Sequence, residues 1–236
     1  MLKNIFKIII IFTIGTIGGI FADQILWPYF IERPLFYKYR LEQSPVYVTE
    51  KYEVFIEENT LLEDIVEDVE KSVIGIGTAV SGKNISGSGI IVTSDGLVLT
   101  LAELVPASGA FAFYVDSKVL EYQILKRDLD KNLALIKINE ENLKTVAFAD
   151  FGSLRYGKRI FLVSSFFEKG LNKSVNEGII KNYNDKIIQT NMTDKTNVKG
   201  SPVFNIKGEL VGIANVDSLG KISAVPINII REFIGL

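Results

Sequence analysis

Short apolar runs separated by turn-forming residues dominate the chain from residue 73 onward. Runs of this kind, bounded by Gly, Asn and Asp, are typical of β-strands, and many of them in succession predict a sandwich or a barrel. The predicted strands are Ile74–Val80, Gly89–Val92, Leu97–Leu101, Ala110–Val115, Glu121–Leu125, Leu133–Ile138, Arg159–Val163, Gly178–Asn182, Lys186–Gln189, Val203–Phe204, Glu209–Asn215 and Lys221–Ala224. The pattern therefore predicts a mainly β domain.

Helical periodicity occurs on either side of this β region. Thr60 and Glu63 form a capping box, and apolar residues then recur at helical spacing through Glu70. A last short helix is predicted to open at Pro226 and to end near Ile234, with one apolar face. Both helices are expected to pack on the β domain.

The first 22 residues form an apolar segment that follows Lys3 and Lys7. Its length approaches the roughly 20 residues that a membrane span requires, and the two lysines place the N-terminus in the cytoplasm. The alternative is a cleaved signal peptide that ends at Ala22. Because the bulky Ile20 suits a cleavage site poorly, we expect an uncleaved transmembrane anchor with an extracytoplasmic folded domain.

Residues 23–58 form a predicted connector between this anchor, at residues 1–22, and one folded domain at residues 59–236. The connector is rich in aromatic residues, which could lie at the membrane interface, pack on the domain or form an interface between copies of the chain. Its prolines favour an extended or turned backbone over a helix. They are Pro28, Pro34 and Pro45.

The net charge and the absence of cysteine and histidine limit the partners and the catalytic chemistry that we expect. The 26 Lys and Arg against 28 Asp and Glu give a net charge of -2, so we expect no nucleic-acid partner. The chain has no cysteine and no histidine. It therefore forms no disulfide and lacks the commonest general base and a common metal ligand, and we predict no metal site and no cofactor.

A polar loop lies between two predicted strands near the C-terminus, and its last six residues are Asn197-Val198-Lys199-Gly200-Ser201-Pro202. This loop resembles the Gly-Asn-Ser-Gly-Gly-Pro nucleophile loop of trypsin-like serine proteases of the HtrA group. Lys199 occupies the position of the serine. Asn197 replaces a glycine, and because Asn tolerates positive φ better than most residues, this substitution is compatible with the family's loop shape.

The resemblance continues in order from about residue 73 to residue 235. The matching segments are Ser86–Ile91, Ser94–Thr100, Leu101–Val105, Arg127–Ile138, Gly157–Phe167, Gly178–Ile180, Gly208–Ile213 and Ala224–Asn228. The resemblance implies a trypsin-like double barrel of two antiparallel β-barrels, preceded here by an N-terminal transmembrane helix. Because it ends with the last predicted helix, we expect no peptide-binding PDZ domain after it.

The resemblance also places Glu103 at the catalytic histidine, Asn132 at the aspartate and Lys199 at the serine. Loss of the serine or the histidine alone costs on the order of a million-fold in turnover. We therefore expect that the chain is not an enzyme, and that it is a pseudoprotease that acts by binding or assembly. The binding residues would be the rest of the loop, namely Asn197, Val198, Gly200 and Ser201.

An alternative is a serine endopeptidase with a Ser-Lys pair, in which Lys199 activates Ser201 or Ser164. Lysine acts as a base only when it is uncharged, and a nearby Glu103 would favour the charged form. We expect instead that Glu103 and Lys199 form an ion pair across the barrel junction, with Asn132 donating its amide to the Glu103 carboxylate. The expected partners are a peptide or protein and, by the resemblance, further copies in a homotrimer.

Overall fold

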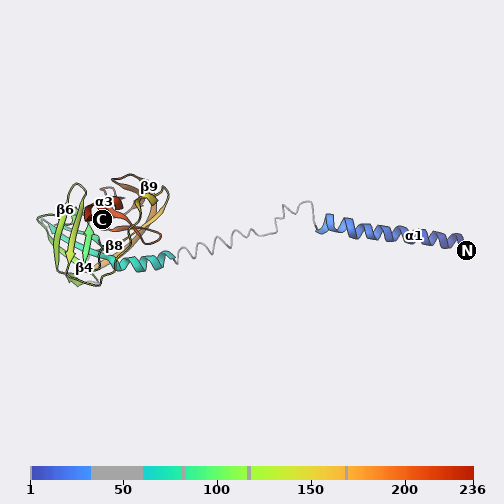
Figure 1. The fold of residues 1–236 in the computed structure, drawn as a ribbon, viewed down its shortest axis with the longest axis horizontal. Coiled ribbons are helices and arrows are strands. Elements are labelled where there is room, and N and C mark those ends of the chain that lie inside the picture. Colours follow the sequence, from blue (N-terminus) through green and yellow to red (C-terminus); the bar gives the residue numbers. More distant parts are fainter. Residues whose placement is uncertain (1, 33–60, 81–82, 116–117, 168–169) are drawn as a thin grey trace. The chain divides into compact units, whose positions relative to one another are not determined.

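The protein consists of two units, Met1–Ile56 and Glu57–Leu236. We describe each unit by itself, from a computed structural model (Figure 1). The residues that the structure describes are 2–32, 61–80, 83–115, 118–167 and 170–236.

The first unit contains the helix α1 (Leu2–Phe21), which η1 (Ala22–Glu32) continues. The segment Lys3–Trp27 has a mean hydropathy of 2.2 and is long and apolar enough to cross a membrane. The hydroxyl of Thr13 donates to the carbonyl oxygen of Ile9 at 2.7 Å, so this polar group has a partner within the helix itself. Such a partner is what a hydrocarbon environment requires of a polar group.

The helical structure of η1 corrects the expectation of a non-helical backbone around Pro28. η1 has the wider turn of a π-helix and continues α1 directly, so the backbone at position 28 is helical as part of one apolar helical segment. The rest of the predicted connector, residues 33–58, lies outside the described residues.

The second unit is mainly β and contains two antiparallel sheets. Its strands are β1 (Val73–Val80), β2 (Lys83–Ile91), β3 (Leu97–Thr100), β4 (Ala110–Val115), β5 (Lys118–Leu120), β6 (Tyr122–Asp128), β7 (Leu133–Ile138), β8 (Arg159–Phe167), β9 (Leu171–Tyr183), β10 (Ile188–Thr193), β11 (Pro202–Asn205), β12 (Leu210–Val216) and β13 (Lys221–Pro226). The first seven strands form an open sheet in the order β5-β4-β1-β2-β3-β7-β6. The other six close into a barrel in the order β10-β13-β12-β11-β8-β9. The predicted double-barrel architecture is confirmed, with the first barrel present as a half-barrel.

Alternating apolar positions on these strands fill the interior of each sheet. Ile74, Ile76 and Phe113 are fully buried in the core of the first sheet, and Leu162 and Val211 in the core of the second. Another buried cluster contains residues of both sheets and joins them. Its members include Ile90, Leu99, Phe161, Phe204, Ile213 and Ile230.

Helices cover this joining cluster. Residues 61–69 are helical, and Val69 packs into the cluster. The C-terminal helix α3 (Ile227–Ile234) contributes Phe233 from its apolar face. The predicted C-terminal helix is therefore confirmed, whereas Thr60 of the predicted capping box lies outside the described residues.

Hydroxyl groups link the two sheets beside this core. Ser88 of β2 is fully buried, and its Oγ accepts a hydrogen bond from the backbone N–H of Ser165 in β8 and donates one to the carbonyl oxygen of the same residue, each at 2.9 Å. The Ser201 hydroxyl donates to the same Oγ at 3.1 Å. The backbone N–H of Ser88 donates to the carbonyl oxygen of Lys199 at 2.8 Å. One residue of the first sheet thus fixes the polar loop of the second.

Candidate functional site

Glu103, Asn132 and Lys199 meet at the junction of the two sheets, although they lie far apart in the sequence. Glu103 lies in the 3₁₀ helix η4 (Ala102–Leu104), which follows β3. Asn132 immediately precedes β7, and its backbone carbonyl oxygen accepts a hydrogen bond from the N–H of Ala102 at 3.2 Å. Lys199 follows the 3₁₀ helix η6 (Thr196–Val198).

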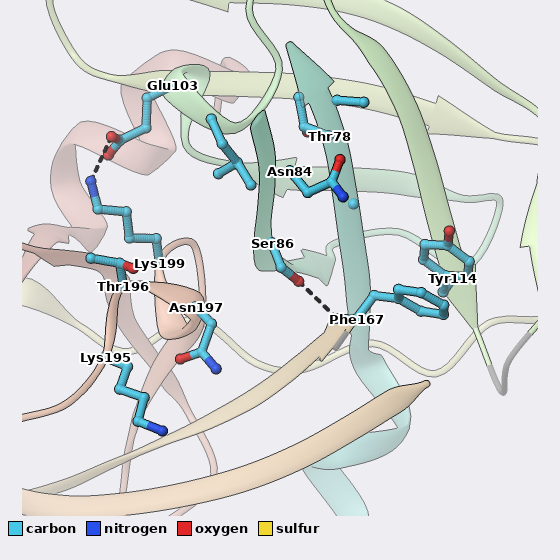
Figure 2. Close-up of a pocket in the computed structure, with 13 residues that line it drawn as sticks. Thr78, Asn84, Ser86, Glu103, Tyr114, Phe167, Lys195, Thr196, Asn197 and Lys199 are labelled. Carbon is cyan, nitrogen blue, oxygen red and sulfur yellow. Dashed lines mark hydrogen bonds and ion pairs between the residues drawn. The ribbon is translucent and has the colours of Figure 1, made fainter. Parts of the chain in front are cut away.

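The predicted ion pair is present, and the Glu103 carboxylate is its centre. Nζ of Lys199 donates to Oε2 of Glu103 at 2.7 Å, and Nδ2 of Asn132 donates to Oε1 at 3.2 Å (Figure 2). The backbone N–H of Glu103 donates to Oδ1 of Asn132 at 3.1 Å. The side chains of Lys199 and Glu103 are 20% and 37% exposed, so the pair lies at the edge of the solvent rather than in the core.

The loop before Lys199 is closed by its own backbone hydrogen bonds. The N–H of Lys199 donates to the carbonyl oxygen of Thr196 at 3.2 Å, and that of Val198 donates to Lys195 at 3.3 Å. Among the described non-glycine residues, only Asn132 and Asn142 have positive φ. Asn197 therefore does not take the conformation expected from the resemblance, because a 3₁₀ turn requires negative φ.

The predicted loop residues have different environments. Val198 and Ser201 are 1% and 0% exposed, and Gly200 is also buried. Gly200 has a φ of 76°, and a Cβ atom there would lie 2.2 Å from the carbonyl oxygen of Ser88. Of the four residues named as binding candidates, only Asn197 lines the neighbouring groove. The other three residues are buried within the loop and do not line the groove.

That groove has a volume of about 800 Å³ and lies between β1, β2 and the loop that carries Lys199. Its lining residues are Gly77, Thr78, Ala79, Asn84, Ile85, Ser86, Glu103, Tyr114, Phe167, Lys195, Thr196, Asn197 and Lys199. Figure 2 shows the Glu103–Lys199 pair on one side and the rings of Tyr114 and Phe167 on the other. Sequence reasoning found the first side and missed the second, because the aromatic residues belong to distant strands.

The two aromatic rings form a preassembled wall. Tyr114 and Phe167 are stacked, with ring centroids 4.8 Å apart and an interplanar angle of 14°. The Phe167 side of this wall is fixed by its backbone N–H, which donates to Oγ of Ser86 at 2.7 Å. Phe167 remains 43% exposed, and an exposed ring beside a groove is suited to contact with a ligand.

The serines of the alternative Ser-Lys arrangement have other partners. The Ser201 hydroxyl donates to Ser88, and Oγ of Ser164 lies 2.6 Å from Oγ of Ser174. Nζ of Lys199 donates to Glu103 and to neither serine. The described residues contain no group of three or more His, Cys, Asp or Glu side chains that could hold a metal ion.

The fold is similar to that of solved trypsin-like proteins. The crystal structure of Deg5 superposes with a TM-score of 0.65 and 19% sequence identity. The match covers 75% of this chain and 93% of that one. A likeness at this identity supports the fold, and not a shared activity.

Curated relatives match a shorter part of the chain. A probable periplasmic serine endoprotease DegP-like from Pseudomonas putida is 35% identical over 136 residues, which are 54% of this chain and 28% of the relative. A putative serine protease HhoB from Synechocystis is 30% identical over 158 residues, or 60% of this chain and 38% of the relative. The chain thus spans well under half the length of these relatives, which are of the HtrA type that the sequence resembles.

These relatives correct the expectation that the chain is not an enzyme. Their names are those of serine endoproteases, which points to proteolytic activity. The expectation rested on Glu103, Asn132 and Lys199 alone. Three side chains are insufficient grounds, because proteases that lose triad members retain about 10³–10⁴-fold catalysis over water through substrate binding and oxyanion stabilisation.

A profile of the trypsin-like peptidase domain matches residues 87–213. The matched region includes Glu103, Asn132 and Lys199, the groove beside them, and strands of both sheets. Since this region is more than half of the sequence, the chain belongs to the trypsin-like peptidase domain family.

Proposed function

We propose that the folded domain binds an extended segment of polypeptide in the groove beside the Glu103–Lys199 pair. The observation that carries the proposal is the groove itself, whose volume of about 800 Å³ is in the range of protein ligand sites. Both sheets contribute to its walls, so a bound segment would contact the rigid framework on either side of the junction.

The groove offers both kinds of contact that an extended peptide needs. Ile85 and Phe167 present exposed apolar surface, 38% and 43% of each residue, while Asn84 and Thr196 are exposed polar residues. An extended peptide carries side chains alternately on its two faces. Apolar and polar groups in one groove can therefore hold alternate side chains of the same segment.

The conformation of the loop determines which hydrogen-bond donors a bound peptide would meet near Lys199. Stabilising a peptide carbonyl as it becomes negatively charged requires free N–H groups aimed at the oxygen. The N–H of Lys199 donates instead to Thr196, and the Lys199 ammonium is paired with Glu103. A peptide carbonyl bound beside Lys199 would thus meet an N–H and an ammonium group that already have partners.

The N-terminal helix supports a membrane location for this binding activity. We assign residues 1–22 as the anchor, 23–58 as the connector and 59–236 as the extracytoplasmic domain. Lys3 and Lys7 at the start of the segment favour a cytoplasmic N-terminus. The periplasmic designation of the DegP-like relatives is consistent with a domain on the other side of the membrane.

Assembly into a homotrimer is a further part of the proposal and rests on the HtrA resemblance. It is tested by light scattering of the detergent-solubilised chain with the detergent mass subtracted. A particle of three protein chains supports assembly, whereas a single chain of 26.3 kDa at working concentration contradicts it.

The groove proposal is tested by fluorescence anisotropy with the full chain in detergent and a fluorescein-labelled, permanently unfolded protein such as reduced, carboxymethylated α-lactalbumin. Ala79 is exposed on β1 and lines the groove, so Ala79→Trp would occupy part of its volume. We expect this variant to weaken binding about tenfold, or about 1.4 kcal/mol. Ala107→Trp, at an exposed residue that does not line the groove, is the control. Equal binding by both variants would contradict the proposal.

Serine endoproteolysis is the second candidate, and the names of the relatives favour it. In this chain it requires Lys199 to leave Glu103 and approach a hydroxyl such as that of Ser201. A fluorophosphonate probe with mass spectrometric mapping tests it, together with hydrolysis of the same unfolded reporter. Labelling of a serine in the wild type, lost in its alanine variant along with hydrolysis, would establish this activity.

A further inference from the structure

We propose that the groove selects polypeptide segments in which an aromatic side chain lies near an acidic one. This inference rests on the proposed function and names its ligand class. It follows from two features of the groove, the ammonium group of Lys195, which has no partner among the described residues, and the stacked rings of Tyr114 and the exposed Phe167.

Among the described charged residues that line the groove, Lys195 is the one without a partner. The charged residues that line it are Glu103, Lys195 and Lys199. Glu103 and Lys199 neutralise each other at 2.7 Å. In the part of the chain that the structure describes, the exposed ammonium of Lys195 has neither an ion-pair nor a hydrogen-bond partner. A ligand carboxylate would therefore be attracted without displacing an existing partner.

Asp194, the acidic residue that precedes Lys195 in the sequence, does not form an ion pair with the Lys195 ammonium. Oδ1 of Asp194 accepts the backbone N–H of Lys195 at 2.8 Å, and Oδ2 accepts Nδ2 of Asn176 at 3.0 Å. The backbone N–H of Asp194 donates to Gly220, which holds this residue against a neighbouring loop. Lys195 lines the groove whereas Asp194 does not, and both carboxylate oxygens of Asp194 already accept other hydrogen bonds.

The opposite side of the groove, formed by Tyr114 and Phe167, is suited to binding an aromatic ring. Tyr114 and Phe167 are already stacked at 4.8 Å, and the backbone of Phe167 is tied to Ser86, so a third ring would find an ordered surface. Ile85, 38% exposed, adds apolar area in the same groove. Aromatic pairs contribute beyond the area that they bury, which favours an aromatic over an aliphatic ligand side chain.

Asn197 adds a polar contact between these two walls. Its Oδ1 is shielded from solvent and accepts no hydrogen bond from the described residues. A buried acceptor without a donor carries a desolvation cost, which a peptide N–H could remove if the carboxamide rotated toward the groove. With that rotation, the groove would offer an acceptor for the ligand backbone as well as contacts for two of its side chains.

The test uses the full chain in detergent and fluorescein-labelled 12-residue peptides of Gly and Ser that carry one Phe and two Glu, at separations of one to five residues. Matched peptides replace Glu with Lys, or Phe with Gly. We expect the Phe-Glu peptides to bind about threefold to fivefold more tightly than the Phe-Lys peptides at low salt, the ratio that one well-formed exposed ion pair supplies. This preference should fall at high ionic strength.

Variants of the groove then assign the preference to its two walls. Lys195→Glu should reverse the order of the Glu and Lys peptides, and Phe167→Ala should reduce binding of the Phe peptides about tenfold without changing the charge preference. The controls are Lys181→Glu and Leu219→Ala, at exposed residues that do not line the groove. Circular dichroism checks that each variant is folded.

The outcomes separate this inference from the proposed function. A charge preference that Lys195→Glu reverses supports the inference. Binding that is blocked by Ala79→Trp but is indifferent to peptide charge and to Lys195 overturns the inference and leaves the proposed function standing. An absence of binding by every peptide and by the unfolded reporter overturns both.

Discussion

Lys199 and Glu103 are 96 residues apart in the sequence and form an ion pair across the junction of the two sheets, with Nζ 2.7 Å from Oε2. Their partial exposure decides how much this pair stabilises the protein. At 20% and 37% exposure, solvent screens both charges, and pairs of this kind contribute up to about 1 kcal/mol. The pair therefore links the sheets without dominating their association.

A double-mutant cycle measures this link. For Glu103→Ala, Lys199→Ala and the double variant, we expect a coupling free energy of about 0.5–1 kcal/mol in urea unfolding followed by circular dichroism. The Glu67–Lys71 pair, with both side chains more than half exposed and 3.6 Å apart, should give about 0.3 kcal/mol. Strictly additive effects at positions 103 and 199 would show that the ion pair contributes nothing in solution.

The buried serine at the junction should matter more than the ion pair. Ser88→Ala leaves the buried N–H of Ser165 without an acceptor and removes the partner of the Ser201 hydroxyl. We expect a loss of about 1–3 kcal/mol in the free energy of unfolding. Ser94→Ala, at an exposed turn residue, should change it by less than about 0.5 kcal/mol. Equal effects would mean that the network is not formed.

Two glycines separate the effect of backbone conformation from that of crowding. Gly200 and Gly157 both have a φ of 76°, but a Cβ at Gly200 would lie 2.2 Å from the carbonyl oxygen of Ser88, whereas one at Gly157 would meet nothing within 4 Å. Gly157→Ala should therefore cost about 1 kcal/mol for the positive φ alone. Gly200→Ala should cost about 2–4 kcal/mol, since overpacking adds to that strain. Similar unfolding midpoints for the two variants would contradict the close contact at Gly200.

The sequence predicted the strands best where the apolar run is nearly continuous. Residues 110–115 and 133–138 form strands with the predicted bounds, and Lys137 is the only polar residue in either run. β9 extends well beyond the predicted Gly178–Asn182, since most residues at its start are polar and at least partly exposed and carry no alternation. The short strand β5 (Lys118–Leu120) was missed for a similar reason, as two of its three residues are exposed.

The site was predictable only where a motif marked it. The ordered resemblance brought Glu103, Asn132 and Lys199 together, and opposite charges at facing positions predicted their contact. No local pattern connects Tyr114 with Phe167, because their contact depends on how the end of β8 crosses the first sheet. The hydrogen bond from the backbone N–H of Lys199 to the carbonyl oxygen of Thr196 was not predicted either, since the same sequence can form a 3₁₀ turn or an open loop.

The last prediction concerns the N-terminal segment, which we expect to remain attached and to span the membrane. Intact mass measurement of membrane-extracted protein should give the full chain of 26.3 kDa, and a mature N-terminus at Asp23 would show that the segment is a cleaved signal.

Lysine substitution tests whether the segment spans the membrane. Ile14→Lys and Ile17→Lys place charges near the middle of Lys3–Trp27, where each costs about 2.5–3.5 kcal/mol, and should move the protein out of the membrane fraction. Asn4→Lys adds the same charge beside Lys3, at the end of the segment, and should leave the protein in the membrane, because a lysine there can reach the headgroups. If a variant that combines Ile14→Lys and Ile17→Lys stayed in the membrane fraction, a transmembrane role for this helix would be contradicted.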